Sequence, residues 1–202
     1  MEKLDLKAQY KALYAPSVKN VGVVTVPAFQ FLAVDGAGDP NTSERYHQAI
    51  EALFALSYTL KFLVREVLDI DYGVMPLEGL WWMEDMREFS QDAKDRWLWT
   101  AMIMQPAFIT PELIERAREQ AAKKKALPML PELRLETVEE GLAAQIMHIG
   151  PFSAEGPTIE KVHQFIRDSG HALTGKHHEI YLTDIRRAAP ERWKTVVRQP
   201  MR

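Results

Sequence analysis

Two halves of the chain predict the same order of elements, and this repeat constrains the fold more than any other feature. Each half reads as a strand, a helix and two further strands. The first half places them at residues 29–34, 46–67, 72–82 and 97–105, and the second at residues 142–149, 157–169, 177–183 and 193–199. A duplicated β-α-β-β unit predicts a pseudo-symmetric α+β protein with a ligand groove where the two units meet.

We expect residues 1–202 to form a single domain built on this repeat. The first unit spans residues 27–105 and the second spans residues 135–200. A connecting helix at residues 110–126 opens with Thr110-Pro111, a capping residue followed by a proline at the first helical position. The helix of the first unit is the clearest element, because apolar residues recur at spacings of three and four without glycine or proline. Asn41 is predicted to cap it, with Thr42 and Ser43 as alternatives.

The two later strands of the first unit differ in character. Residues 72–82 contain Gly73, Pro76 and Gly79, which is typical of an edge or bulged strand. Residues 97–105 are apolar on both faces, which predicts a central strand. The charged segment 84–96 between them is expected to be a hairpin loop.

Composition excludes several classes of protein. The 202 residues contain no cysteine, so disulfides, thiolate nucleophiles and cysteine-based zinc sites are ruled out, which suits a cytoplasmic protein. The net charge of −3 disfavours nucleic-acid binding. No apolar run approaches the roughly 18 residues of a membrane span, and the charged first residues do not resemble a signal peptide.

The sequence also lacks the usual signatures of metal and cofactor sites. His177 and His178 are adjacent in a strand and point to opposite faces, and the remaining histidines show no ligand spacing. There is no G-x-S-x-G motif, and the GAG of DGAGDP is an incomplete dinucleotide fingerprint. We therefore expect no metal and no cofactor.

Glu179 is the most informative polar residue. Alternation along HHEIYLT places His177, Glu179 and Tyr181 on one face of a strand and His178 and Ile180 on the other. One interpretation is a solvated sheet face. The other is a carboxylate at the floor of the groove, with a pKa raised by desolvation, which neutralises a cationic ligand or acts as a general base on water.

Tryptophans support the second interpretation of Glu179. Trp81 and Trp82 are successive residues of one strand, so at least one of them is expected to face the groove, and Trp97 and Trp99 lie on a neighbouring strand. For any single tryptophan, a place in the hydrophobic core is the better explanation. Several aromatic rings around one carboxylate, however, are typical of a site for a flat, cationic or electrophilic molecule.

The chain resembles the stand-alone GyrI-like small-molecule-binding proteins. The resemblance covers essentially the whole chain from Leu4 and is carried by FLAVDGAGDPN, EALFALSYTLKF, DYGVMPLEGLWW, HIGPF, HHEIYLTDIRR and KTVVRQP. It implies a tandem of SHS2-type β-α-β-β units. It also implies a buried glutamate, matched by Glu179, that meets cationic drugs among aromatic rings.

Some family members hydrolyse cyclopropane-bearing alkylating compounds. The resemblance therefore implies a catalytic role for Glu179 and Tyr181, with Trp81 and Trp82 as ligand-binding partners. The family's usual Ser-Asp-Pro after the strand is replaced by Thr183-Asp184-Ile185.

Three functions remain open at this point. The first is a hydrolase in which Glu179 activates water, and the second is a module that binds or sequesters planar cations without turnover. A gyrase-inhibitor-like protein is the least favoured, since nothing marks a partner face. We also expect no DNA-binding segment before the domain, which disfavours direct regulation of transcription. In either favoured case the largest apolar pocket should lie between the units, lined by Glu179 and at least one of Trp81 and Trp82.

Overall fold

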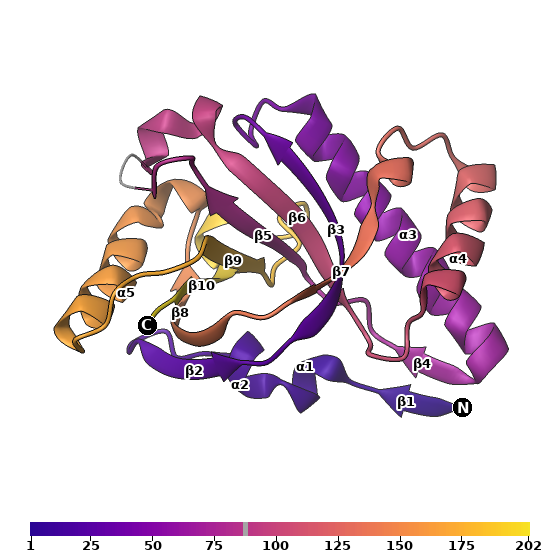
Figure 1. Ribbon diagram of the computed structural model, residues 1–202, viewed down its shortest axis with the longest axis horizontal. Coiled ribbons are helices and arrows are strands. Elements are labelled where there is room, and N and C mark those ends of the chain that lie inside the picture. The colour runs from indigo at the N-terminus through magenta and orange to yellow at the C-terminus, as the bar shows by residue number, and fades with distance from the viewer. Residues whose placement is uncertain (87–88) are drawn as a thin grey trace.

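An antiparallel sheet of eight strands forms the centre of the computed structural model, which describes residues 1–86 and 89–202 (Figure 1). The strand order is β2-β8-β10-β9-β5-β6-β3-β7. The strands are β2 (Gly22–Val26), β3 (Phe29–Ala37), β5 (Leu77–Trp82), β6 (Leu98–Gln105), β7 (Arg134–Val138), β8 (Gly141–Ile149), β9 (His177–Tyr181) and β10 (Lys194–Pro200). A separate parallel pair joins β1 (Glu2–Leu4) to β4 (Ile70–Tyr72).

The helices are α1 (Leu6–Gln9), α2 (Lys11–Tyr14), α3 (Glu44–Leu68), α4 (Pro111–Lys124) and α5 (Gly156–Asp168). Ser43, one of the three expected capping residues, is the N-cap of α3 and accepts a hydrogen bond from the backbone N–H of Tyr46. Thr110 caps α4 in the same way, as its sequence predicts.

The strand order confirms the tandem α+β fold. The first unit contributes β5-β6-β3 and the second contributes β9-β10-β8, and the two units meet where β5 pairs with β9. The outermost strands are exchanged between the units: β2 precedes the first unit but pairs with β8, and β7, at the start of the second unit, pairs with β3. Neither of these exchanged strands was expected from the sequence.

The expectation that residues 72–82 form an edge strand is wrong. Gly73 and Pro76 lie before β5, which begins at Leu77, so only Gly79 falls inside the strand. β5 is bonded to β9 on one side and β6 on the other. The hairpin between β5 and β6 has the expected position and contains a short 3₁₀ helix at Gln91–Arg96, while residues 87 and 88 of that connection lie outside the described residues.

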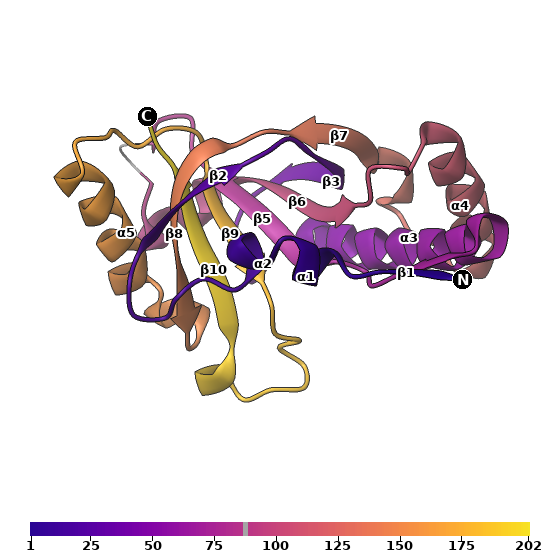
Figure 2. The same ribbon diagram turned by 90° about the horizontal axis from the view of Figure 1, so that it is seen from below.

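Helices α3 and α5 cover the same face of the sheet at its two ends (Figure 1). α4 packs on the outer side of α3. The short helices α1 and α2 lie across the other face (Figure 2). The β5–β9 junction therefore presents one face towards the two long helices and the other towards the N-terminal segment.

No helix among the described residues combines the length and apolarity needed to cross a membrane.

Candidate functional site

The site is built on the β5–β9 pair, where the two units meet. His177, Glu179 and Tyr181 share one face of β9, as alternation predicts, and they lie on the face covered by α3 and α5. Across the pair, Trp81 is opposite His177 and Gly79 is opposite Glu179. The structure thus brings Glu179, Tyr181 and Trp81 together.

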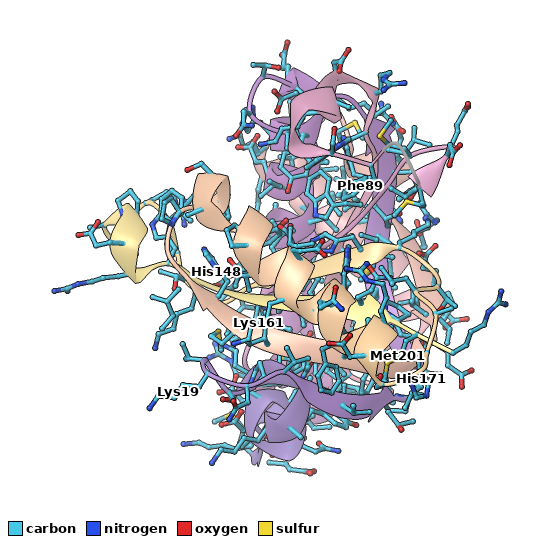
Figure 3. All side chains as sticks on the ribbon, turned by 90° about the vertical axis from the view of Figure 1, so that its left-hand side faces the viewer. Lys19, Phe89, His148, Lys161, His171 and Met201 are labelled. Carbon is cyan, nitrogen blue, oxygen red and sulfur yellow. The ribbon has the colours of Figure 1, made fainter. Side chains whose placement is uncertain are left out.

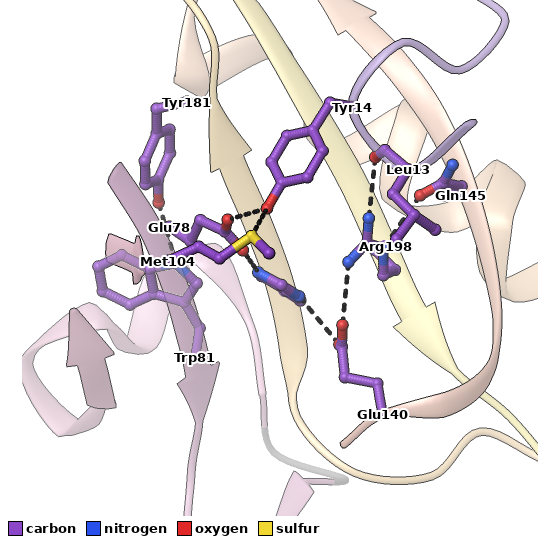
Figure 4. Close-up of polar contacts among 10 residues, drawn as sticks. Leu13, Tyr14, Glu78, Trp81, Met104, Glu140, Gln145, Tyr181 and Arg198 are labelled. Atoms are coloured by element: carbon purple, nitrogen blue, oxygen red, sulfur yellow. Dashed lines mark hydrogen bonds and ion pairs between the residues drawn. The ribbon is translucent and has the colours of Figure 1, made fainter. Parts of the chain in front are cut away.

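A chain of hydrogen bonds ends at the Glu179 carboxylate. Trp81 Nε1 donates to Tyr181 Oη at 3.0 Å (Figure 4). Tyr181 Oη donates in turn to Glu179 Oε2 at 2.8 Å, while His177 Nε2 lies 2.9 Å from Glu179 Oε1. Both carboxylate oxygens are therefore bonded, although the Glu179 residue is only 8% exposed.

The pKa of Glu179 departs from the sequence-based expectation. Burial alone raises the pKa, as expected for a carboxylate away from water. The hydrogen bonds and charge of His177, together with the hydrogen bond from Tyr181, outweigh burial and hold the pKa of Glu179 below its ordinary value. The expected raised pKa is therefore wrong, because the sequence did not reveal how many donors meet this carboxylate.

The phenols beside Glu179 are neutral hydrogen-bond donors. Burial, reinforced by the negative charge of Glu179, raises the pKa of Tyr181 well above its ordinary value. The same two causes raise the pKa of Tyr46 on α3. Both hydroxyl groups keep their protons at physiological pH, so Tyr181 can donate a hydrogen bond to the carboxylate without becoming charged.

Aromatic rings surround this polar chain on several sides. Tyr46 packs against Trp81 and Trp99, with ring centroids 5.6 and 5.0 Å apart. Further aromatic pairs extend this cluster of rings. They are Trp81 with Trp97, Phe89 stacked on Trp97, and Phe152 against both Tyr181 and Trp193. Phe89 is visible beyond one side of α5 in Figure 3. A carboxylate enclosed by ring faces and edges suits organic cations and flat molecules.

Trp82 does not belong to this site, which corrects the prediction that groups it with Glu179. Alternation turns its side chain to the opposite face of the sheet, where Lys176 Nζ lies 3.4 Å from the Trp82 ring centroid. A cleft of about 540 Å³ opens there, lined by Trp82 together with Lys176, Asp35, Arg134 and other polar residues. This cleft contains neither Glu179 nor Trp81, so the larger of the two described cavities is not the expected pocket.

A second buried polar network occupies that opposite face (Figure 4). His178 lies between Glu78 and Glu140, at 2.9 Å from each carboxylate. Arg198 donates to Glu140 at 3.0 Å, and Tyr14 of α2 donates to Glu78 at 2.7 Å. Every member has a partner, and the network fastens the N-terminal segment to the sheet.

The charges of this network shift its pKa values in opposite directions. Burial lowers the pKa of His178, but Glu140 and Glu78 outweigh it and raise the value to about 9. The pKa of Glu140 falls to about 2, because His178 and Arg198 outweigh the effect of its burial. His178 is therefore positively charged and Glu140 negatively charged at neutral pH.

Glu155 is a site residue that sequence reasoning missed. It immediately precedes α5 and is 1% exposed, and its Oε1 atom has no hydrogen-bond partner among the described residues. Burial and the neighbouring Glu179 charge raise the pKa of Glu155 far above its ordinary value. Its segment, GPFSAEGP, reads as a turn, and a turn carries no alternation from which burial of one glutamate can be inferred.

Comparison with known proteins identifies the family. The model of the GyrI-like small molecule binding domain matches residues 19–202. The chain belongs to this family. The GyrI-like domain is 42% identical to a conserved protein from Listeria innocua, with a TM-score of 0.91 over 98% of this chain and 100% of that one. A hydrolase from Listeria innocua is 40% identical, with a TM-score of 0.88 and full coverage of both chains.

More distant structures share the fold with this GyrI-like domain. The EcmrR C-terminal domain, at 12% identity, has a TM-score of 0.55 over 91% of this chain and 97% of that one. Comparison with curated proteins returned no significant match. Within the described residues of the domain, no group of three or more His, Asp or Glu side chains is arranged to hold a metal ion.

Proposed function

We propose that this GyrI-like protein binds planar, cationic or electrophilic organic molecules at Glu179 and hydrolyses those that carry a strained cyclopropane ring. The observation that carries the proposal is the buried Glu179 carboxylate, bonded by Tyr181 and His177 and walled by aromatic rings. The family is a small-molecule-binding one, and a hydrolase from Listeria innocua matches the chain over its full length at 40% identity. We place this activity in the cytoplasm.

Binding of a cation at this site has a simple electrostatic basis. A charge in a water-poor environment attracts an opposite charge more strongly than it does in bulk water. Glu179 supplies one negative charge, and the faces of Trp81, Tyr46 and Phe152 add their own attraction for cations. Because the Glu179 residue is only 8% exposed, a cation bound beside its carboxylate would be largely shielded from water.

Hydrolysis requires that Glu179 remain ionised, and its hydrogen bonds ensure this. With its pKa held below the ordinary value, the carboxylate is available as a proton acceptor throughout the neutral range. A low pKa also makes it a weak base, so most of the catalysis would come from the position of the water and the electrophile. Tyr181 and Trp81 hold the carboxylate in one orientation, which favours such positioning.

Product analysis by mass spectrometry tests the proposal. The substrate is a cyclopropane conjugated to a carbonyl group, and the expected product carries one added water. Glu179→Gln should slow its formation by about 10²–10⁴-fold, the usual contribution of a general base. The matched control is Glu160→Gln on α5, where Glu160 is exposed and pairs with Arg167.

The result distinguishes the hydrolase from a binding module. Conversion above the buffer rate that depends on Glu179 supports the enzyme. Binding of the same compound without conversion by the wild-type protein would instead support sequestration, for which the buried carboxylate and its aromatic walls are sufficient.

A further inference from the structure

We propose that His177 takes the proton from the attacking water through its Nδ1 atom, while the Glu179 carboxylate holds the imidazole ring from the other side. This inference rests on the proposed hydrolysis at Glu179 and names the residue through which that carboxylate acts. It assigns a role to a buried ring nitrogen that the proposed function leaves unused.

The two nitrogen atoms of the His177 ring have different surroundings. Nε2 lies 2.9 Å from Glu179 Oε1. Nδ1 has no hydrogen-bond partner among the described residues, although His177 is only 2% exposed. Buried polar atoms are rarely left without a partner, and those that are commonly meet a water molecule or serve in catalysis. Nδ1 is therefore placed to bind a water molecule.

The Glu179 carboxylate decides which ring nitrogen of His177 carries the hydrogen. An ionised carboxylate has only lone pairs to offer, so Nε2 must be the donor in the contact with Oε1. Tyr181 donates to the other carboxylate oxygen, which leaves both oxygens as acceptors. In a neutral imidazole with its hydrogen on Nε2, the lone pair is on Nδ1. The unpartnered nitrogen is therefore a proton acceptor.

The His177 ring lies against the aromatic rings among which the ligand is proposed to bind. Its centroid is 5.9 Å from that of Phe89, which stacks on Trp97. Trp81 is the cross-strand partner of His177 and also packs against Trp97. A water molecule on Nδ1 would thus share its surroundings with a flat molecule held by these rings.

The imidazole is better suited to this proton transfer than the carboxylate beside it. Hydrogen bonds from His177 and Tyr181 hold the pKa of Glu179 below its ordinary value, which makes Glu179 a weak base. Histidine, in contrast, is the side chain that exchanges protons most readily near neutral pH. Once His177 has taken the proton, the negative charge of Glu179 stabilises the imidazolium, as in the carboxylate–histidine pairs of many hydrolases.

The bonds and protons of ring opening balance with one molecule of water. The water oxygen attacks a ring carbon of a cyclopropane conjugated to a carbonyl group, so a C–O bond forms and one ring C–C bond breaks. The electron pair of the broken bond moves to the carbonyl oxygen, and His177 Nδ1 takes the proton that the water loses. The resulting enolate oxygen takes a proton from solvent, and the imidazolium returns its proton to solvent.

His177→Gln tests this assignment, because the glutamine amide can still donate a hydrogen bond to Glu179 but has no basic nitrogen. Turnover of the cyclopropane substrate should fall by about 10²–10⁴-fold, the usual contribution of a general base. Binding of ethidium, a planar cation, should be unchanged because Glu179 keeps its charge. His171→Gln, in the turn after α5, is the control and should change neither quantity.

Three results would overturn the assignment, and they can be told apart. Turnover of His177→Gln close to that of the wild type would leave the hydrolase standing, with Glu179 itself as the base. A loss of turnover matched by an equal loss of ethidium binding would show that His177 has a structural role. Absence of conversion by the wild-type protein would overturn the hydrolase function and, with it, the role of His177.

Nitrogen NMR of isotope-labelled histidine rings keeps the test independent of how the variant folds. At neutral pH the wild-type His177 ring should carry its hydrogen on Nε2 and none on Nδ1. A hydrogen on Nδ1 under these conditions would overturn the proposal, because that nitrogen would then have no lone pair with which to accept a proton.

Discussion

Gly79 lies directly across the β5–β9 pair from Glu179, and its lack of a side chain makes room for the groups that hold the carboxylate. A Cβ atom at Gly79 would lie 2.6 Å from Trp81 Nε1 and 3.1 Å from Tyr181 Oη, which are the two members of the hydrogen-bond chain leading to Glu179. The glycine inside β5 is thus part of the construction of the site.

Gly79→Ala should therefore displace Trp81 or Tyr181 and weaken the protein. Forcing a methyl group into a packed interior typically costs about 1–3 kcal/mol, and the midpoint of chemical denaturation measures that loss. Gly73→Ala is the matched control, since a Cβ at Gly73 meets nothing within 4 Å. Equal stability of the Gly79 variant and the wild type would show that the two rings do not need this space.

Substitutions of Trp81 and Trp82 should separate the two faces of the sheet. Trp81 is 3% exposed and bonded to Tyr181, so Trp81→Ala should weaken ethidium binding and also cost about 3–5 kcal/mol of stability. Trp82 is half-buried on the far face, so Trp82→Ala should leave ethidium binding unchanged and cost less. Fluorescence titration measures ethidium binding, and denaturation measures stability. Weaker ethidium binding only in the Trp82 variant would contradict this expectation, because it would place the ligand on the face of the sheet opposite Glu179.

Glu179→Gln should lower stability, because the carboxylate is bonded on both oxygens. Removing the charge leaves either the Tyr181 hydroxyl or the His177 ring without its acceptor, at a typical cost of about 1–3 kcal/mol. Since the folded pKa of Glu179 lies below its unfolded value, its contribution is present above the unfolded pKa and is lost as the pH falls. Thermal melts of both proteins across the acid range measure this, and a higher melting temperature for the variant would contradict it.

His178 should make the protein less stable as the solution becomes alkaline. Its folded pKa of about 9 lies above the unfolded value near 6.5, so its stabilisation is complete below about pH 6.5 and is lost as the pH rises through 9. Between those values the free energy of unfolding should fall less steeply in His178→Gln than in the wild type. Parallel curves for the two proteins would mean that His178 is not charged in the fold.

Local patterns in the sequence predict the parts of the site that depend on a single strand. Alternation places His177, Glu179 and Tyr181 on one face and separates Trp81 from Trp82, because side-chain direction in a strand has a period of two residues. The central position of β5 was not predictable in this way, since it depends on pairing with a strand about a hundred residues later in the chain.

The burial of Glu155 was also not predictable from local sequence patterns. Its burial follows from how α5 packs on the sheet, and no periodic pattern in the preceding turn records that packing. The lowered pKa of Glu179 could likewise not be predicted from the sequence, because it depends on hydrogen bonds to the carboxylate from His177 and Tyr181 and not on burial alone.

A crystal structure with bound ethidium tests the central claim most directly. The account predicts the planar cation between α3 and α5, beside Trp81 and Phe152 and with its charge facing the Glu179 carboxylate. Ethidium seated in the cleft beside Trp82 and Lys176, with the Glu179 surroundings unchanged, would contradict it.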